Sequence, residues 1–236
     1  RHKQYREIVT NCDIASETAI TGYLLKHYPG AKVFSEEVGE ITGSDETVFI
    51  VDPIDGTHNF IHNIPFYAIS IGMYTGDRPY AGIIYLPEFD EYFYAVQGGG
   101  AYCNGTKITC SKTEKLKDAV IVYDNQFHLN QDMARHLMPI VEHCFTLRIF
   151  GSACVDLCNV ARGTVEARIF HRVKSVDFAA GYVIIKEAGG SVVNFQGRPA
   201  SLTDRTVIAS NGKIENEIIT LFNSVDKGNV LPELES

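Results

Sequence analysis

Two aspartates, Asp52 and Asp55, stand three residues apart directly after a short apolar strand predicted over residues 47–51. Pro53 fixes its own φ and biases Asp52 towards extended backbone, so the strand is expected to end there in one defined bend. Two carboxylates on such a bend can face one hard cation, because these cations prefer oxygen ligands. The alternative is an ordinary turn, since Asp-Pro and Asp-Gly are common turn dipeptides.

Gly56 and Thr57 follow at once, ahead of a predicted helical turn. A glycine lets the backbone approach a ligand closely, and the free N–H groups at the start of a helical turn attract an anion. The stretch therefore predicts a cation and a phosphate group side by side.

Further carboxylates favour the cation over the ordinary turn. Glu36 and Glu37 come directly after another apolar strand predicted over residues 32–34, and Asp177 stands at the head of an apolar helix. Strand ends and helix starts are where open metal sites are built in layered α/β proteins.

These motifs resemble those of one protein family. They are Ser35-Glu36-Glu37, Asp52-Pro53-Ile54-Asp55-Gly56-Thr57, and Asp177-Phe178-Ala179-Ala180-Gly181 with Glu187-Ala188-Gly189-Gly190. In their order and spacing the chain is similar to the magnesium-dependent, lithium-sensitive inositol monophosphatase superfamily, which includes sugar bisphosphatases. The resemblance covers nearly the whole chain, and the family's usual first helix would fall before Arg1.

The resemblance implies a site for two or three Mg²⁺ ions. Four carboxylates in one cleft repel each other and need cations to stay ionised together. One ion would lower the pKa of a bound water and another would stabilise the leaving oxygen. The expected metal ligands are Glu36, Asp52, Asp55 and Asp177 with the carbonyl of Ile54.

The expected catalytic residues are Thr57, Asp13 and Glu37. In the family, the aspartate of a Thr-x-x-Asp pattern, here Thr10 and Asp13, helps the threonine of the Asp-Gly-Thr motif to activate water. Asp13 is equally a natural N-cap for a helix predicted over residues 13–27, and Asp177 is a natural N-cap as well as a ligand. Glu37 is either a partner of the ligands or a surface glutamate. Gly56 and Thr57 are expected to bind the phosphate through their N–H groups.

The substrate is expected to meet two further segments. Residues 151–153 (Gly151, Ser152 and Ala153) open a helix whose N–H groups could meet a hydroxyl or a second phosphate. Phe170 stands where relatives commonly carry a glutamate that contacts inositol hydroxyls, and an aromatic ring cannot accept those hydrogen bonds. Arg172 and Lys174 could reach a second phosphate, or they are solvated loop charges.

Composition narrows the function class. The chain has 236 residues, 45% hydrophobic and 21% charged, and a formal net charge of −8, which argues against nonspecific nucleic-acid binding. No apolar run approaches the roughly 18 residues of a transmembrane helix, and no secretory signal opens the chain. The six cysteines form no Cys-x-x-Cys pair, which favours reduced thiols in a cytoplasmic protein.

The order of the predicted elements indicates the fold class. Strands over residues 68–74, 81–86 and 91–96 predict an antiparallel meander, and strand and helix alternate from about residue 116. We expect residues 1–116 to form an α+β half with most of the metal ligands, and residues 117–236 to form an α/β half that completes the active site. The resemblance implies a layered αβαβα sandwich, and a homodimer.

The sequence therefore predicts a Mg²⁺-dependent phosphomonoesterase for a small polyol or sugar phosphate, with inositol 1-phosphate and fructose 1,6-bisphosphate as leading substrates. The alternatives are a nucleotide 3′-phosphatase acting on 3′-phosphoadenosine 5′-phosphate, a histidinol-phosphatase of the same superfamily, or a member kept as a regulatory binding protein. The residues after Thr57 resemble the inositol and sugar branch, so the nucleotide is expected to be a poor substrate.

Overall fold

The larger of two β-sheets carries the segment with both aspartates. In the computed structural model, which describes residues 10–37, 39–41, 43–128 and 132–228, this sheet has the strand order β2-β1-β3-β4-β5-β6-β7-β8. β1 and β3 pair in parallel, and the other neighbours pair antiparallel. The strands are β1 (Lys32–Ser35), β2 (Gly39–Ile41), β3 (Thr47–Asp55), β4 (Ala68–Thr75), β5 (Arg78–Leu86), β6 (Glu91–Val96), β7 (Gly100–Cys103) and β8 (Thr106–Ile108).

The smaller sheet is mixed and has the order β10-β9-β11-β13-β12. β9 pairs in parallel with β10 and β11, whereas β13 runs antiparallel to β11 and β12. The strands are β9 (Val120–Val122), β10 (Thr146–Arg148), β11 (Ala167–Phe170), β12 (Ser191–Asn194) and β13 (Val207–Ser210).

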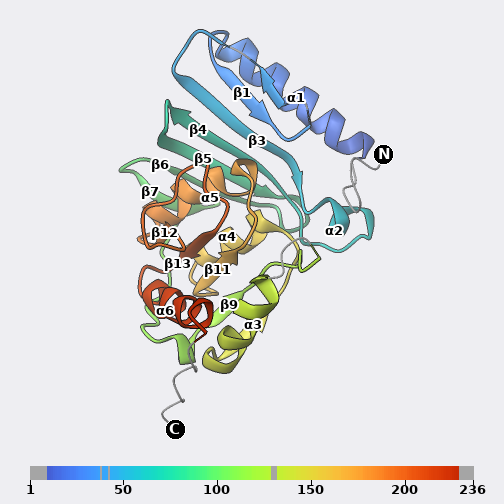
Figure 1. Cartoon of the computed structure of the whole chain (residues 1–236). Coiled ribbons are helices and arrows are strands. Elements are labelled where there is room, and N and C mark those ends of the chain that lie inside the picture. Colours follow the sequence, from blue (N-terminus) through green and yellow to red (C-terminus); the bar gives the residue numbers. More distant parts are fainter. Residues whose placement is uncertain (1–9, 38, 42, 129–131, 229–236) are drawn as a thin grey trace.

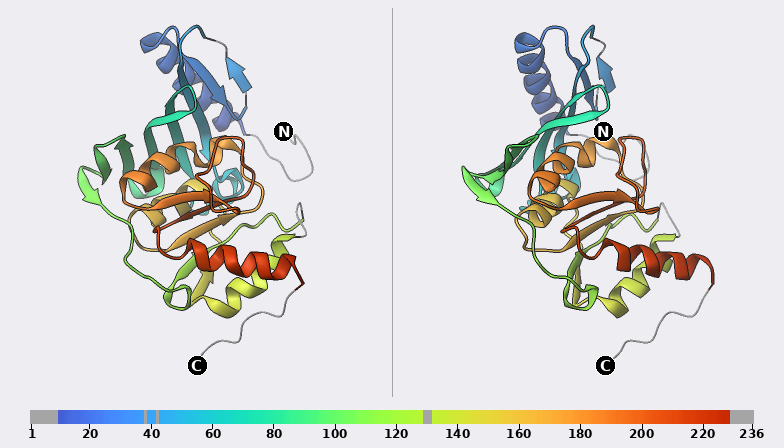
Figure 2. Two further views of the ribbon diagram at one scale, coloured as in Figure 1. Left: turned by 60° about the vertical axis from the view of Figure 1, so that its left-hand side comes forward. Right: turned by 90° about the vertical axis from the view of Figure 1, so that its left-hand side faces the viewer.

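Helices pack on each face of each sheet, and on the outer face of the large sheet α1 (Asn11–His27) packs against the end formed by β1, β3 and β4 (Figures 1 and 2). α4 (Ala153–Ala161) and α5 (Ser175–Glu187) lie between the sheets, and α3 (Asp132–His143) and α6 (Glu215–Asp226) cover the small sheet. The five layers read helix, sheet, helix, sheet, helix, so the predicted αβαβα sandwich is confirmed.

Side-chain alternation along β3 explains why this strand is covered on both faces. Phe49 and Val51 pack with Leu24 of α1, whereas Ile50 between them packs with Val176 and Ala179 of α5. Successive residues of a strand point to opposite faces, so a continuous apolar run is required where both faces are buried. The apolar run thus leads Asp52 and Asp55 into the interior.

Helix α5 lies unusually close to the large sheet. A Cβ atom added to Gly82 would stand 2.5 Å from the carbonyl oxygen of Ala180, and one added to Gly72 would stand 3.0 Å from the Cβ of Ala179. A side chain on either strand residue would push the helix away. These glycines therefore fix the height of α5 above the sheet and, with it, the place of Asp177 near its N-terminus.

The structure corrects the predicted bend after residue 51. β3 continues to Asp55, and its pairing with β4 shifts register between Asp52 and Asp55. A bulge lets one strand accommodate Pro53 without ending the ladder. The strands β2, β7 and β8 were not expected. The glycines at residues 98–100 are typical of a turn, and β7 begins at the last of them. The sequence also favours a short strand over residues 7–10, which lie almost wholly outside the described residues. The division at residue 116 stays a prediction.

Candidate metal centre

Asp52 is the most deeply buried acidic side chain at the end of β3, with 1% of its surface exposed. Within the described part of the chain, its Oδ1 has no hydrogen-bond donor. Burial raises the pKa of Asp52 well above its usual value. The pKa is raised further by three nearby carboxylates, Glu36, Asp55 and Asp177, and lowered by the ammonium of Lys174. A buried oxygen with no donor, surrounded by negative charge, fits the place of a cation.

Asp55 is held by the N-terminus of α4. Its carboxylate accepts hydrogen bonds from the Ser152 hydroxyl, from Ala153 N at 3.1 Å and from Cys154 N at 2.8 Å. Burial raises the pKa of Asp55, and these three hydrogen bonds oppose the rise. Ser152 and Ala153 were predicted to meet substrate, and the donors described here are directed at Asp55 instead. Their contact with a substrate stays a prediction.

Asp177 is the third residue of α5, and the residue that caps this helix is Lys174. The predicted N-cap role of Asp177 is therefore wrong by three positions: its Oδ2 accepts from Lys174 N at 2.8 Å and closes the turn from inside the helix. Burial raises the pKa of Asp177 to about 7, with Glu36 and Asp55 adding to the rise. Asp177 therefore faces the same negative field as Asp52.

Glu36 lies directly after β1 and reaches across to α5. Its Oε1 lies 3.0 Å from the Lys174 Nζ, so this predicted ligand is engaged by a lysine. Glu37 donates its backbone N–H to the Glu17 Oε1 at 3.2 Å. Glu17 is a buried carboxylate of α1 that the sequence did not point to, and it anchors the turn that carries Glu36. A catalytic role for Glu37 stays a prediction.

Asp13 takes part in capping α1 and also contacts Thr57, and its catalytic role stays a prediction. Thr10, not Asp13, is the N-cap of α1, and Asp13 is the third residue of a capping box whose Oδ2 is bound by the N–H and hydroxyl of Thr10. The Thr57 hydroxyl lies 3.2 Å from Asp13 Oδ1 and 3.0 Å from the Ile54 carbonyl oxygen. Ser16 of α1 also donates to the Pro53 carbonyl at 2.9 Å. α1 is thereby tied to both sides of the Asp52–Thr57 segment.

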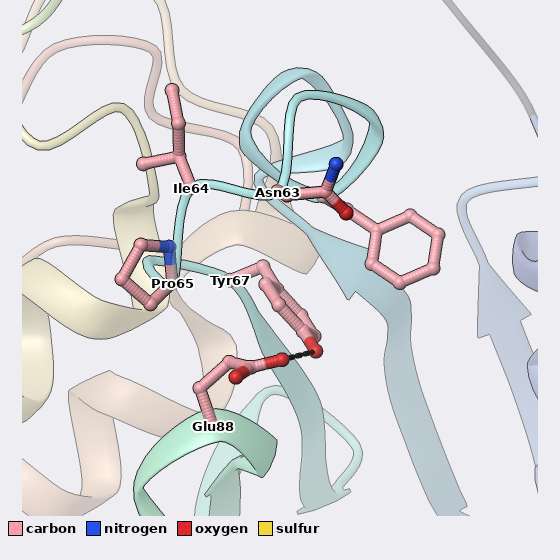
Figure 3. Close-up of a pocket in the computed structure, with 6 residues that line it drawn as sticks. Asn63, Ile64, Pro65, Tyr67 and Glu88 are labelled. Carbon is pink, nitrogen blue, oxygen red and sulfur yellow. Dashed lines mark hydrogen bonds between the residues drawn. The ribbon is translucent and has the colours of Figure 1, made fainter.

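Gly56 begins the short helix α2 (Thr57–Ile61) in a left-handed conformation, with φ of 84°. A Cβ added there would stand 2.9 Å from the carbonyl oxygen of Phe66, so both the conformation and the space require glycine. A pocket of about 250 Å³ adjoins this turn and contains the hydrogen bond from Tyr67 to Glu88 at 2.6 Å (Figure 3). Its lining residues are Phe60, Asn63, Ile64, Pro65, Tyr67 and Glu88, none of them a predicted site residue.

The other predicted substrate residues differ in exposure. Phe170 has 2% of its surface exposed and lies under the guanidinium of Arg168, 4.3 Å from the ring centre, so it offers almost no surface to a ligand. Arg172 is exposed. Gly151 has φ of 79°, and a Cβ there would approach the side chain of Asn59, which in turn donates to the carbonyl of Phe150. α2 and the start of α4 are therefore packed together.

The four predicted carboxylates lie near one another but do not form a complete metal site. In the described ranges, no group of three or more His, Cys, Asp or Glu side chains is already arranged to hold a metal ion. Three of the four are instead turned to donors of the protein itself: Glu36 to Lys174, Asp55 to α4 and Asp177 to the backbone of Lys174. No helix in the described part of the chain has the length and apolar character needed to cross a membrane.

Comparison with known proteins places this arrangement in a family. A model of the inositol monophosphatase family matches residues 1–227. The fructose-1,6-bisphosphatase/inositol-1-monophosphatase of Aquifex aeolicus is 35% identical over 220 residues, which cover 92% of this chain and 82% of that protein. The Nus factor SuhB of Pasteurella multocida is 34% identical over 221 residues, covering 92% and 83%. The solved IMPase structure from Thermotoga maritima is 30% identical, with a TM-score of 0.87 over 96% of this chain and 87% of that one. The chain belongs to the inositol monophosphatase family of metal-dependent phosphatases.

Proposed function

We propose that the protein is a Mg²⁺-dependent phosphomonoesterase that hydrolyses a small polyol or sugar phosphate, with inositol 1-phosphate and fructose 1,6-bisphosphate as the leading substrates. The observation that carries this proposal is the buried Asp52 Oδ1, which no donor of the described chain reaches and which lies among further carboxylates. Such an oxygen needs a cation to remain ionised inside the protein.

The proposed ligands are the four carboxylates and one carbonyl. Bound Mg²⁺ would supply a water of lowered pKa and positive charge beside the leaving oxygen. Two or three ions and inhibition by lithium are both expected from the family resemblance. The residues that would hold the ions are Glu36, Asp52, Asp55, Asp177 and the carbonyl of Ile54.

Thr57 is proposed to orient the attacking water. When its hydroxyl hydrogen points to Asp13 Oδ1, the lone pairs of its oxygen are left to accept a hydrogen bond from water. Asp13 is held in place because its other oxygen is bound by Thr10. The N–H groups of Gly56 and Thr57 are proposed to bind the phosphate oxygens, because Gly56 is the N-cap of α2 and N–H groups at a helix start attract anions.

Substrate choice is proposed to depend on a hydrogen-bond acceptor that the proposed site lacks at residue 170. Phe170 supplies no acceptor for inositol hydroxyls, so selectivity for inositol should be weak. Arg172 is exposed and is the proposed partner of a second phosphate. The ammonium of Lys174, which was predicted to share this role, lies 3.0 Å from Glu36 Oε1 instead. We therefore expect fructose 1,6-bisphosphate to be hydrolysed at least as well as inositol 1-phosphate. A homodimer and a cytoplasmic location complete the proposal.

Phosphate release tests the proposal. We would compare kcat/KM for inositol 1-phosphate, fructose 1,6-bisphosphate, histidinol phosphate and 3′-phosphoadenosine 5′-phosphate, each with Mg²⁺ and with excess chelator. Activity on the first two that disappears in chelator supports the proposal. A preference for the nucleotide or for histidinol phosphate would replace the substrate. Undiminished hydrolysis in chelator would overturn the mechanism, and a protein that binds Mg²⁺ without hydrolysing any of the four would favour a regulatory binding role.

A further inference from the structure

Lys174 contacts two of the proposed ligands through different atoms. Its Nζ lies 3.0 Å from Glu36 Oε1, and its backbone N–H donates to Asp177 Oδ2 at 2.8 Å. The side chain of Lys174 is 49% exposed and that of Glu36 is 25% exposed. The ammonium therefore lies at the solvent-exposed side of the carboxylate cluster.

The backbone around Lys174 is firmly placed. Val173 and Val176 on either side are buried, each with 1% of its surface exposed. Val173 donates its N–H to the Arg205 carbonyl at 2.9 Å and accepts from the Arg205 guanidinium at 3.1 Å. These contacts hold the main chain in place, so the Lys174 side chain starts from a fixed point. The Glu36 carboxylate lies within its reach.

The charge at this point matters for any incoming ion. Glu36 is the carboxylate that links β1 to the cluster, and it acts electrostatically on Asp52, Asp55 and Asp177. An ammonium on Glu36 neutralises part of this field, and it would lie within a few ångströms of a dication bound to the same carboxylate. An ammonium and a dication at such a distance repel each other, and they do so more strongly in a partly buried cleft than in bulk water.

We infer that Lys174 is a resident cation of the metal centre: it neutralises Glu36 in the metal-free protein and must leave this carboxylate before an ion can use it. The inference rests on the proposed function, because it takes the carboxylates as Mg²⁺ ligands. Its consequence is that the ion bound through Glu36 is held more weakly than the carboxylates alone would hold it. Lys174 thereby sets the Mg²⁺ concentration at which the centre fills.

Calorimetric Mg²⁺ titration and metal-free melting of the full chain test this inference. We expect Lys174→Met to bind Mg²⁺ about tenfold more tightly than the unsubstituted protein, because one competing charge is gone. In chelator the same variant should melt about 2–4 °C lower, because the carboxylates lose their internal counter-charge. Lys174→Arg keeps the charge and should behave as the unsubstituted protein in both measurements. High salt should shrink the difference in affinity.

Lys186→Met is the matched control, since it removes an exposed lysine from the other end of the same helix and should change neither value. Equal Mg²⁺ affinity in Lys174→Met and the unsubstituted protein would overturn the inference. If only KM for a bisphosphate changes in this variant, Lys174 is a substrate contact and the inference is wrong too. Looser binding in Lys174→Met would overturn it as well. If the unsubstituted protein binds no Mg²⁺, the proposed function is wrong and the inference is wrong with it.

Discussion

Two buried aspartates, Asp52 and Asp156, are partnered in opposite ways. Each has 1% or less of its surface exposed, and burial raises the pKa of each well above the usual value. Asp156 of α4 faces Arg168, whose Nε lies 3.0 Å from its Oδ2. Asp52 lies near three carboxylates, those of Glu36, Asp55 and Asp177, and the single ammonium of Lys174 opposes their effect. One buried charge thus has its counter-ion built into the chain, and the other lies in a field that an external cation would balance.

The difference separates a structural charge from a functional one. The guanidinium of Arg168 also lies over the ring of Phe170, donates to the Ile169 carbonyl at 3.1 Å and lies 3.8 Å from Asp124 Oδ1, so its place is fixed by many contacts. The Asp52 Oδ1 accepts no hydrogen bond in the part of the chain described. Burying either charge is costly. The charge of Asp156 is balanced inside the chain, and that of Asp52 would be balanced by the proposed Mg²⁺.

The largest expected effect is on activity. Asp52→Asn keeps the shape of the side chain and removes the charge that a cation needs, so kcat/KM should fall on the order of 10³-fold or more. Because the same change removes an unbalanced buried charge, the metal-free melting temperature should hold or rise. Phosphate release and thermal melting in chelator check the two halves. Asp55→Asn is a less clean variant, since its amide would face the N–H donors of α4.

Arg168→Met should do the reverse. It leaves Asp156 buried without its counter-charge and should lower the free energy of unfolding by about 3–5 kcal/mol. Mg²⁺ should not close the gap to the unsubstituted protein, since Asp156 is not among the proposed ligands and its counter-charge in the chain is Arg168. Urea unfolding with and without Mg²⁺ measures it. The double variant Asp156→Leu/Arg168→Met should regain most of the stability, and a double variant as unstable as the single one would show that Arg168 acts through other contacts.

Mg²⁺ should stabilise the unsubstituted protein by mass action. A concentration one hundred times the dissociation constant adds about 2.7 kcal/mol for one site. Asp52→Asn should gain much less, whereas Arg168→Met should gain as much as the unsubstituted protein. Melting temperature against Mg²⁺ concentration for the three proteins separates them. An equal gain in all three would remove Asp52 from the ligand set.

The contrast also explains which residues the sequence could point to. In the sequence, Asp52 and Asp55 follow an apolar run and Asp177 comes just before one, so these charges stand out from the residues around them. Asp156 lies inside an apolar helix and Arg168 inside a strand that is buried on both faces, and burial on both faces follows from the tertiary fold. Nothing local distinguishes such a buried ion pair from two solvated charges.

Local sequence patterns also gave a wrong prediction at three residues, Asp13, Asp177 and Pro53. An aspartate three residues into a capping box has the same type and nearly the same place as an N-cap, so Asp13 and Asp177 were each assigned the wrong helix position. Pro53 indicated a strand end, and the bulge in β3 overrode it through pairing with β4, which no local pattern contains. The layered fold was predictable because apolar runs and their periodicity are local features of the sequence. The register between strands depends on pairing with distant residues, so the bulge was not predictable.

The smallest expected effect comes from a third buried polar group, His171, which is neutral. Its Nε2 lies 3.0 Å from His136 Nδ1 and 3.2 Å from the Tyr123 hydroxyl, while His136 Nε2 lies 3.0 Å from Asp226 Oδ1. Burial lowers the pKa of His171 to about 3, with His136 and Arg168 adding to the fall. The folded protein therefore binds fewer protons here than the unfolded chain between about pH 6.5 and pH 3.

His171 thus contributes stability that is complete above pH 6.5 and is lost as the pH falls towards 3. Each pH unit corresponds to about 1.4 kcal/mol, so about 2 kcal/mol should be lost between pH 7 and pH 5. Asp177 acts with the opposite sign in metal-free protein, because its raised pKa makes stability fall as the pH rises towards 7. Urea unfolding of His171→Phe and the unsubstituted protein at the same pH values isolates the histidine: the variant should lose less stability on acidification, and parallel curves would show that His171 is not held neutral by the fold.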